Sequence, residues 1–161
     1  MKKYLFSMLA MAAVLFTACT QEDDFRGNAE GDEVLAAFTI DVPAGAATRA
    51  VGDGTTVTHV ACAVYNADDE ELTALRVNEL EIKDKKATYQ IRLAKGQAYR
   101  VAFFAYNKEY NDYAGVYTLD DLKNIKINDT QLSNIEAHDA FTNYVDVTAQ
   151  ESMNPINKTV V

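Results

Sequence analysis

Apolar and polar residues alternate along much of the chain from residue 34 onward. In AAFTIDV (residues 36–42), every second residue starting with Ala36 is apolar. Successive side chains of a strand point to opposite faces, so this alternation predicts a half-buried strand. VTHVACAVY (57–65) repeats the pattern and places Cys62 on the face of Val60 and Val64. We therefore interpret Cys62 as a small core residue.

Three further segments extend the β pattern. NELEIK (78–83) and ATYQIRL (87–93) alternate on either side of the polar turn at 84–86, which predicts a β-hairpin. After a second turn at Lys95-Gly96, AYRVAFFAY (98–106) is apolar on both faces from Val101 onward. A strand that is covered on both sides requires a second layer, so the pattern predicts an all-β sandwich.

The pattern weakens after Asn107. TLDDLKN (118–124) starts with a threonine followed by an aspartate three residues later and has one apolar stripe, which predicts a short helix. FTNYVDV (141–147) is a strand candidate, and the final NKTVV (157–161) is typical of the start of another strand.

The N-terminus has the form of a targeting signal. Lys2 and Lys3 precede an apolar run from Tyr4 to Ala18, which is shorter than the roughly 20 residues of a membrane-spanning helix. The segment LFTAC ending at Cys19 resembles a bacterial lipobox, which implies cleavage between Ala18 and Cys19 and lipidation of the Cys19 sulfur. Two alternatives stay open: a secretory signal that leaves a free thiol, and an uncleaved anchor.

These segments divide the chain into a signal peptide (1–18), an acidic flexible tether (19–33) and one β-sandwich domain (34–161). The acidic run at 22–24 resembles the export tag of Bacteroidetes surface lipoproteins; the alternative is an ordinary solvated tether. The formal net charge is −9 and would become −11 after loss of the two lysines in the signal. This charge argues against nucleic acid as a partner.

No pattern of catalytic or metal-binding residues emerges. The chain lacks a G-x-S-x-G motif, and His138-Asp139 is the only adjacent acid and base pair. One thiol besides Cys19 and two separated histidines do not make a zinc site. NADDEE (66–71) lacks the glycine of a calcium loop, which favours a solvated turn. We expect no enzyme activity, no catalytic residue, no metal and no cofactor.

The linker PAGAATRAVGDG (43–54) is rich in alanine and glycine and contains Arg49. Such a segment is a favourable place for proteolysis, and cleavage between Arg49 and Ala50 would separate the first strand from the domain. Its loss would expose an apolar groove that another subunit's strand could fill. The alternative is an ordinary loop with an incidental arginine.

The lipobox, the ATRA segment (47–50) and LAKGQAYRVAFFAYN (93–107) together are similar to the N-terminal domain of Bacteroidetes fimbrillin-like, or type V pilin-like, lipoproteins. Close relatives carry the label of a domain of unknown function. The resemblance implies a transthyretin-like, Greek-key β-sandwich, a membrane anchor on Cys19 and maturation at Arg49. It also implies assembly with other pilin subunits by donor-strand exchange, and hence a role in pilus assembly, anchoring or adhesion at the outer membrane.

Two further expectations concern the chain's end and an alternative function. Members of that family continue into a second β-domain, so the chain is expected to be either part of a longer protein or a terminal subunit that accepts a strand. The alternative function is a monomeric surface module that binds a glycan or a host protein through Tyr110, Tyr113 and Tyr117. Tyr99 and Tyr106 are expected in the core.

Overall fold

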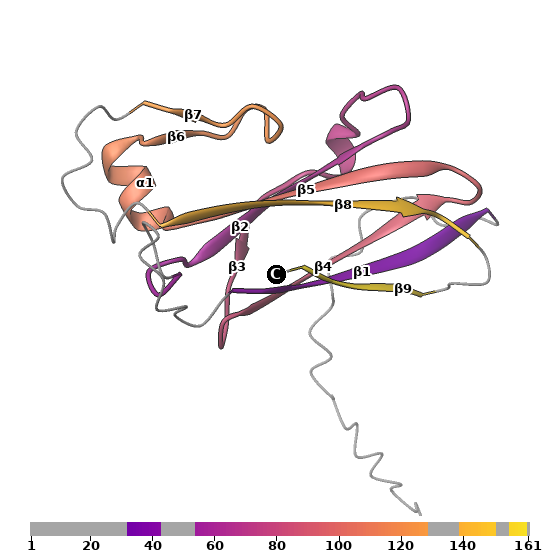
Figure 1. Ribbon diagram of the computed structural model, residues 1–161, viewed down its shortest axis with the longest axis horizontal. Helices are drawn as coiled ribbons and strands as arrows, with labels where there is room; N and C mark the ends of the chain where they lie inside the picture. Colours follow the sequence, from indigo (N-terminus) through magenta and orange to yellow (C-terminus); the bar gives the residue numbers. More distant parts are fainter. Residues whose placement is uncertain (1–31, 43–53, 129–138, 151–154, 161) are drawn as a thin grey trace, which may run out of the picture.

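The computed structural model describes residues 32–42, 54–128, 139–150 and 155–160. These residues form two packed β-sheets with a small lobe on one of them (Figure 1). The elements are β1 (Glu33–Asp41), β2 (His59–Tyr65), a 3-10 turn η1 (Thr73–Leu75), β3 (Val77–Glu81), β4 (Lys86–Ala94), β5 (Ala98–Tyr106), α1 (Lys108–Ala114), β6 (Tyr117–Thr118), β7 (Lys126–Ile127), β8 (Ala140–Thr148) and β9 (Ile156–Val160). Within these ranges, no helix has the length and apolar character needed to cross a membrane.

The strand order is β4-β1-β9 in one sheet and β3-β2-β5-β8 in the other, with β6 and β7 forming a separate pair. β1 runs antiparallel to β4 and parallel to β9. The chain passes back and forth between the two sheets, so neighbours in sequence are often in different layers (Figure 1). The predicted all-β sandwich with one short helix is confirmed.

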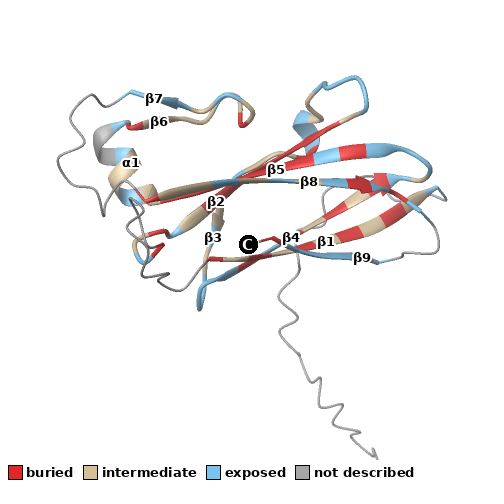
Figure 2. Ribbon diagram, viewed as in Figure 1, coloured by how far each residue is buried: buried red, intermediate tan, exposed pale blue. Residues whose placement is uncertain are grey.

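The main core lies between the two sheets, where the strands carry their buried side chains (Figure 2). At its centre, the Phe38 ring of β1 lies 5.5 Å from the Phe103 ring of β5, measured between centroids, and Phe103 meets Tyr89 of β4 edge-on at 6.3 Å. The Tyr89 hydroxyl donates a hydrogen bond to the Leu75 carbonyl. A buried tyrosine needs such a partner, so this contact fixes where η1 sits over β4.

The predicted hairpin of residues 78–93 is wrong beyond its turn. Asp84 and Lys85 have positive φ angles of 50° and 64°, and Lys83 and Lys86 exchange two backbone hydrogen bonds of 2.8 Å, as in a two-residue hairpin turn. Beyond the turn, β3 pairs with β2 and β4 pairs with β1, in different sheets. Alternation identifies a strand, but it does not identify the strand's partner.

The predicted helix at 118–124 is also wrong, because the helix forms earlier. In α1, Asn107 accepts a hydrogen bond from the Tyr110 amide at its N-terminus, and Gly115 ends it with a φ of 62°. An asparagine N-cap and a left-handed glycine are common helix boundaries. Thr118 instead belongs to β6, where it pairs with Lys126 of β7.

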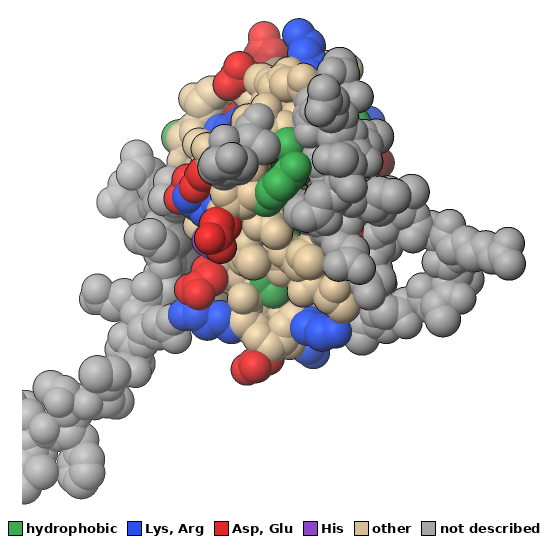
Figure 3. Space-filling view, turned by 90° about the vertical axis from the view of Figure 1, so that its left-hand side faces the viewer, with side chains coloured by type: hydrophobic (Ala, Val, Ile, Leu, Met, Phe, Trp, Pro, Cys, Tyr) green, Lys and Arg blue, Asp and Glu red, His purple; other side chains and the backbone are tan. Residues whose placement is uncertain are grey.

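The lobe formed by α1, β6, β7 and their connections covers the outer face of the four-stranded sheet. A second core forms there from Ala61, Ala63, Tyr65, Ala102, Phe104, Tyr106 and Leu122. The central strands β2 and β5 are therefore buried on both faces, as the sequence predicts for β5, but the second cover is this lobe. Charged side chains gather along one side of this end of the molecule, and apolar ones show in few places (Figure 3).

Candidate strand-exchange site

β1, the first predicted strand, is the central strand of the three-stranded sheet. It pairs with β4 from Glu33↔Ala94 to Asp41↔Lys86 and with β9 from Ala36↔Ile156 to Ile40↔Val160. Its backbone is thus hydrogen-bonded along both edges. Loss of β1 would leave β4 and β9 without their common partner and would divide the sheet.

The inward side chains of β1 contribute a continuous apolar row to the main core. Val34, Ala36 and Phe38 have no exposed surface, and Ile40 is 5% exposed. Burying a side chain the size of valine or phenylalanine contributes about 1.5–3 kcal/mol. A domain without β1 would therefore expose a long apolar slot lined by residues of both sheets.

Both ends of the linker after β1 are fastened to the fold. At one end, the Val42 amide donates a 2.9 Å hydrogen bond to the Lys85 carbonyl. At the other end, the Gly54 amide donates a 2.9 Å hydrogen bond to Oδ2 of Asp139, a carboxylate that is only 2% exposed. Residues 43–53 lie outside the described residues, and with them the predicted cleavage site at Arg49 and Ala50.

The other residues singled out from the sequence fall into two groups. Ala18, Cys19 and His138 lie outside the described residues, so signal cleavage and lipidation stay predictions. Cys62 is fully buried in the main core, as predicted, and this burial raises the pKa of its thiol. A thiol that is both buried and protonated is poorly reactive.

The acidic run at 66–71 forms a turn around the Asn66 side chain. Oδ1 of Asn66 accepts hydrogen bonds from the amides of Asp68 and Glu70, at 3.0 and 2.9 Å. Asp69 pairs with Lys123 at 2.8 Å, and Glu71 pairs with Arg76 at 2.7 Å. These contacts use the carboxylates to connect the turn to its surroundings, in agreement with the predicted solvated turn.

The positions of the tyrosines agree only in part with the prediction of two core tyrosines and three surface tyrosines. Tyr99 and Tyr106 are buried, and burial, followed by the charge of Glu79, raises the pKa of Tyr106 to about 12. The Tyr117 ring packs edge-on against Phe104 with 5.2 Å between centroids, and Tyr110 is half-buried. The side chain of Tyr113 is not among those that the structure describes.

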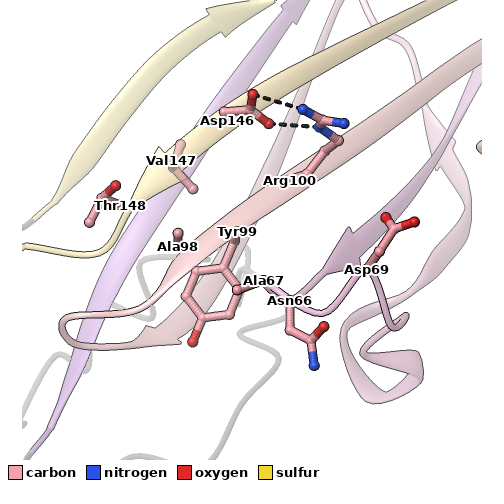
Figure 4. A pocket seen from close by; sticks show the side chains of 9 residues that line it. All are labelled: Asn66, Ala67, Asp69, Ala98, Tyr99, Arg100, Asp146, Val147 and Thr148. Carbon is pink, nitrogen blue, oxygen red and sulfur yellow. Dashed lines mark hydrogen bonds and ion pairs between the residues drawn. The ribbon is translucent and has the colours of Figure 1, made fainter.

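Sequence reasoning missed a polar basin of about 470 Å³ beside the start of β5 and the end of β8 (Figure 4). The Arg100 guanidinium holds both carboxylate oxygens of Asp146 there, at 2.7 and 3.0 Å. This pairing lowers the pKa of Asp146. The two residues are directly opposite on paired strands, so only the strand register could have brought them together.

The fold and this strand arrangement define a two-layer β-sandwich protein whose first strand is central to one layer. The chain belongs to a family of unknown function (DUF6562), whose model matches residues 28–161. The match covers the whole sandwich and the last part of the predicted tether. No curated protein matches the chain significantly.

Replacing Phe38 with alanine should destabilise the domain strongly. The substitution removes a fully buried ring between Phe103 and Tyr89, so we expect a loss of about 3–5 kcal/mol in the free energy of unfolding, measured by chemical denaturation. The matched control is Thr39→Ala on the opposite face of β1, with a loss below about 1 kcal/mol. Equal losses would show that β1 does not anchor the core.

Proposed function

We propose that this protein is a lipid-anchored surface lipoprotein of the bacterial outer membrane that assembles with other subunits by exchange of β1. In this proposal, lipid on Cys19 holds the uncut precursor at the membrane, and cleavage between Arg49 and Ala50 separates the lipidated segment that contains β1 from the rest of the domain. A strand from another subunit then takes the place of β1. The protein would act in the assembly or anchoring of a fimbrillin-like pilus, or in adhesion. It would have no enzyme activity.

The central position of β1 is the observation that carries this proposal. A replacement strand between β4 and β9 can form hydrogen bonds along both of its edges and can bury an apolar residue at every second position. An edge strand would offer only one such row. The contacts at this position are therefore extensive enough to support a long-lived link between subunits.

The linker supplies the second line of support. The linker is the covalent connection from the C-terminal end of β1 to the rest of the domain. Arg49 is the only basic residue in it. Val42 and Gly54 are each hydrogen-bonded to other parts of the fold. A cut at Arg49 would remove the covalent bond and leave β1 attached through non-covalent contacts, which a competing strand can replace.

Assembly is tested by immunoblotting the producing cells, with and without boiling, together with mass spectrometry of the mature N-terminus. We expect a heat-sensitive ladder built from chains that begin at Ala50. Arg49→Ala should abolish both the ladder and the new N-terminus. The matched control is Arg26→Ala in the tether, because a cut at Arg26 leaves β1 attached and its loss should change nothing.

A single band that begins at Cys19 in the wild-type protein would contradict strand exchange. It would favour the alternative of a monomeric binding module. The polar basin around Arg100 and Asp146 would then be the first surface to test for a ligand.

Cys19→Ala tests the membrane anchor separately. The comparison is made in the Arg49→Ala protein, in which Cys19 and the domain stay in one chain. Without the acylated sulfur, this protein has no lipid chain to hold it, so it should move from the membrane fraction to the soluble fraction. Ser7→Ala, in the apolar run of the signal, is the control and should leave fractionation unchanged. Membrane association that survives Cys19→Ala would contradict the lipoprotein assignment.

A further inference from the structure

One opening of the sandwich contains an apolar cavity beside the C-terminal end of β1. The edge strands β8 and β9 border this opening, with β8 above β9 in Figure 1. The cavity has a volume of about 300 Å³. Its apolar lining comes from both sheets and consists of Ile40, Val42, Phe103, Ala105, Phe141 and Val160.

The inner face of β8 is incompletely covered along this opening. Phe141, Asn143 and Val145 are only half-buried, whereas Val147 further along the same face is buried. The sheet of β8 has four strands and the facing sheet has three. A further strand beside β9 would extend the smaller sheet over this opening.

Lys158 lies on β9 two residues before Val160, which lines the cavity. In the parallel pairing of β9 with β1, Ile156 lies beside Ala36 and Val160 lies beside Ile40, and all four are buried. Lys158 lies between them beside Phe38, so it projects from the same core-facing side of the sheet. Its side chain is nevertheless exposed, and no ion pair joins it to another described residue.

A lysine on the inward face of an edge strand has two consequences. It opposes the addition of a strand whose inward residues are all apolar, because the ammonium group would lose its water without gaining a partner. It favours a strand that places a carboxylate at that position. The edge is therefore selective for the sequence of the strand that it accepts.

We propose that the outer edge of β9, beside which no described strand lies, binds an extended segment of a partner protein that has an acidic residue and a bulky apolar residue two positions apart. The acidic residue would face Lys158, and the apolar residue, on the same face of the added strand, would enter the cavity beside Val160. The backbone groups on the side of β9 away from β1 would hydrogen-bond the segment along its length. β1 stays in place when the segment binds, so this binding does not require the proposed exchange.

A second copy of this chain is a poorer occupant than a different protein. Antiparallel pairing of β9 with β9 of a second copy, in the register that pairs all five residues, would place the two Lys158 side chains opposite each other. Like charges directly opposite on paired strands are destabilising. The net charge of −9 adds repulsion between copies.

The test measures binding of two short threonine-rich peptides by fluorescence anisotropy. In one, an aspartate and a phenylalanine lie two positions apart; in the other, a lysine replaces the aspartate. We expect the aspartate peptide to bind about three- to tenfold more tightly, and Lys158→Glu to reverse this preference. Replacing the phenylalanine of the peptide with alanine should weaken binding by at least the same factor, because the peptide then has no side chain to fill the cavity.

The controls keep this result separate from folding and from the proposed function. All measurements use the full chain with Arg49→Ala, in which the proposed cut cannot occur, so failure here leaves strand exchange unaffected. Lys126→Glu, which makes the same charge change on β7, should leave the preference unchanged. Equal binding of both peptides, no binding of either, or self-association through β9 in sedimentation experiments would overturn the proposal.

Discussion

The pairing of β1 along both of its edges is the constraint on which the rest of the fold depends. It joins β4, which precedes β5 in the chain, to β9, which comes from the far end, and it supplies the apolar row that packs against β5. Without β1, β9 has no partner among the described strands. A contact of this kind makes one strand essential both to its sheet and to the core.

The sequence predicts the strands well because alternation is a local property. β1, β2, β3 and β4 lie where period-two patterns place them, β8 lies at the predicted strand candidate, and the apolar character of β5 on both faces correctly indicates cover on both sides. What the sequence does not predict is pairing between distant segments. The turn at Asp84 and Lys85 has the expected chemistry, yet the strands on either side enter different sheets. The apolar stripe of 118–124 favours a helix there, whereas the boundary residues Asn107 and Gly115 place the helix between them.

The candidate functional residues also divide into those that local sequence identifies and those that depend on contacts between distant segments. Arg49 and Cys19 can be identified from local sequence, and their roles stay predictions. The roles of Asp139 and Lys158 could not be identified in this way, because they depend on which distant segments lie together. Asp139 reaches Gly54 across 85 positions of sequence, and Lys158 becomes an inward-facing charge only once β9 lies beside β1. Each conclusion requires knowing which strand is next to which.

Locking β1 in place gives the most direct test of strand exchange. Thr39 of β1 and Thr88 of β4 are directly opposite, and opposite residues of an antiparallel pair have Cα atoms roughly 4.5–5.5 Å apart, within the range that a disulfide spans. In a Thr39→Cys, Thr88→Cys protein, the account predicts that the heat-sensitive ladder disappears when the disulfide forms and returns when it is reduced. A ladder that persists with the disulfide fully formed would contradict it, since β1 could not then have left.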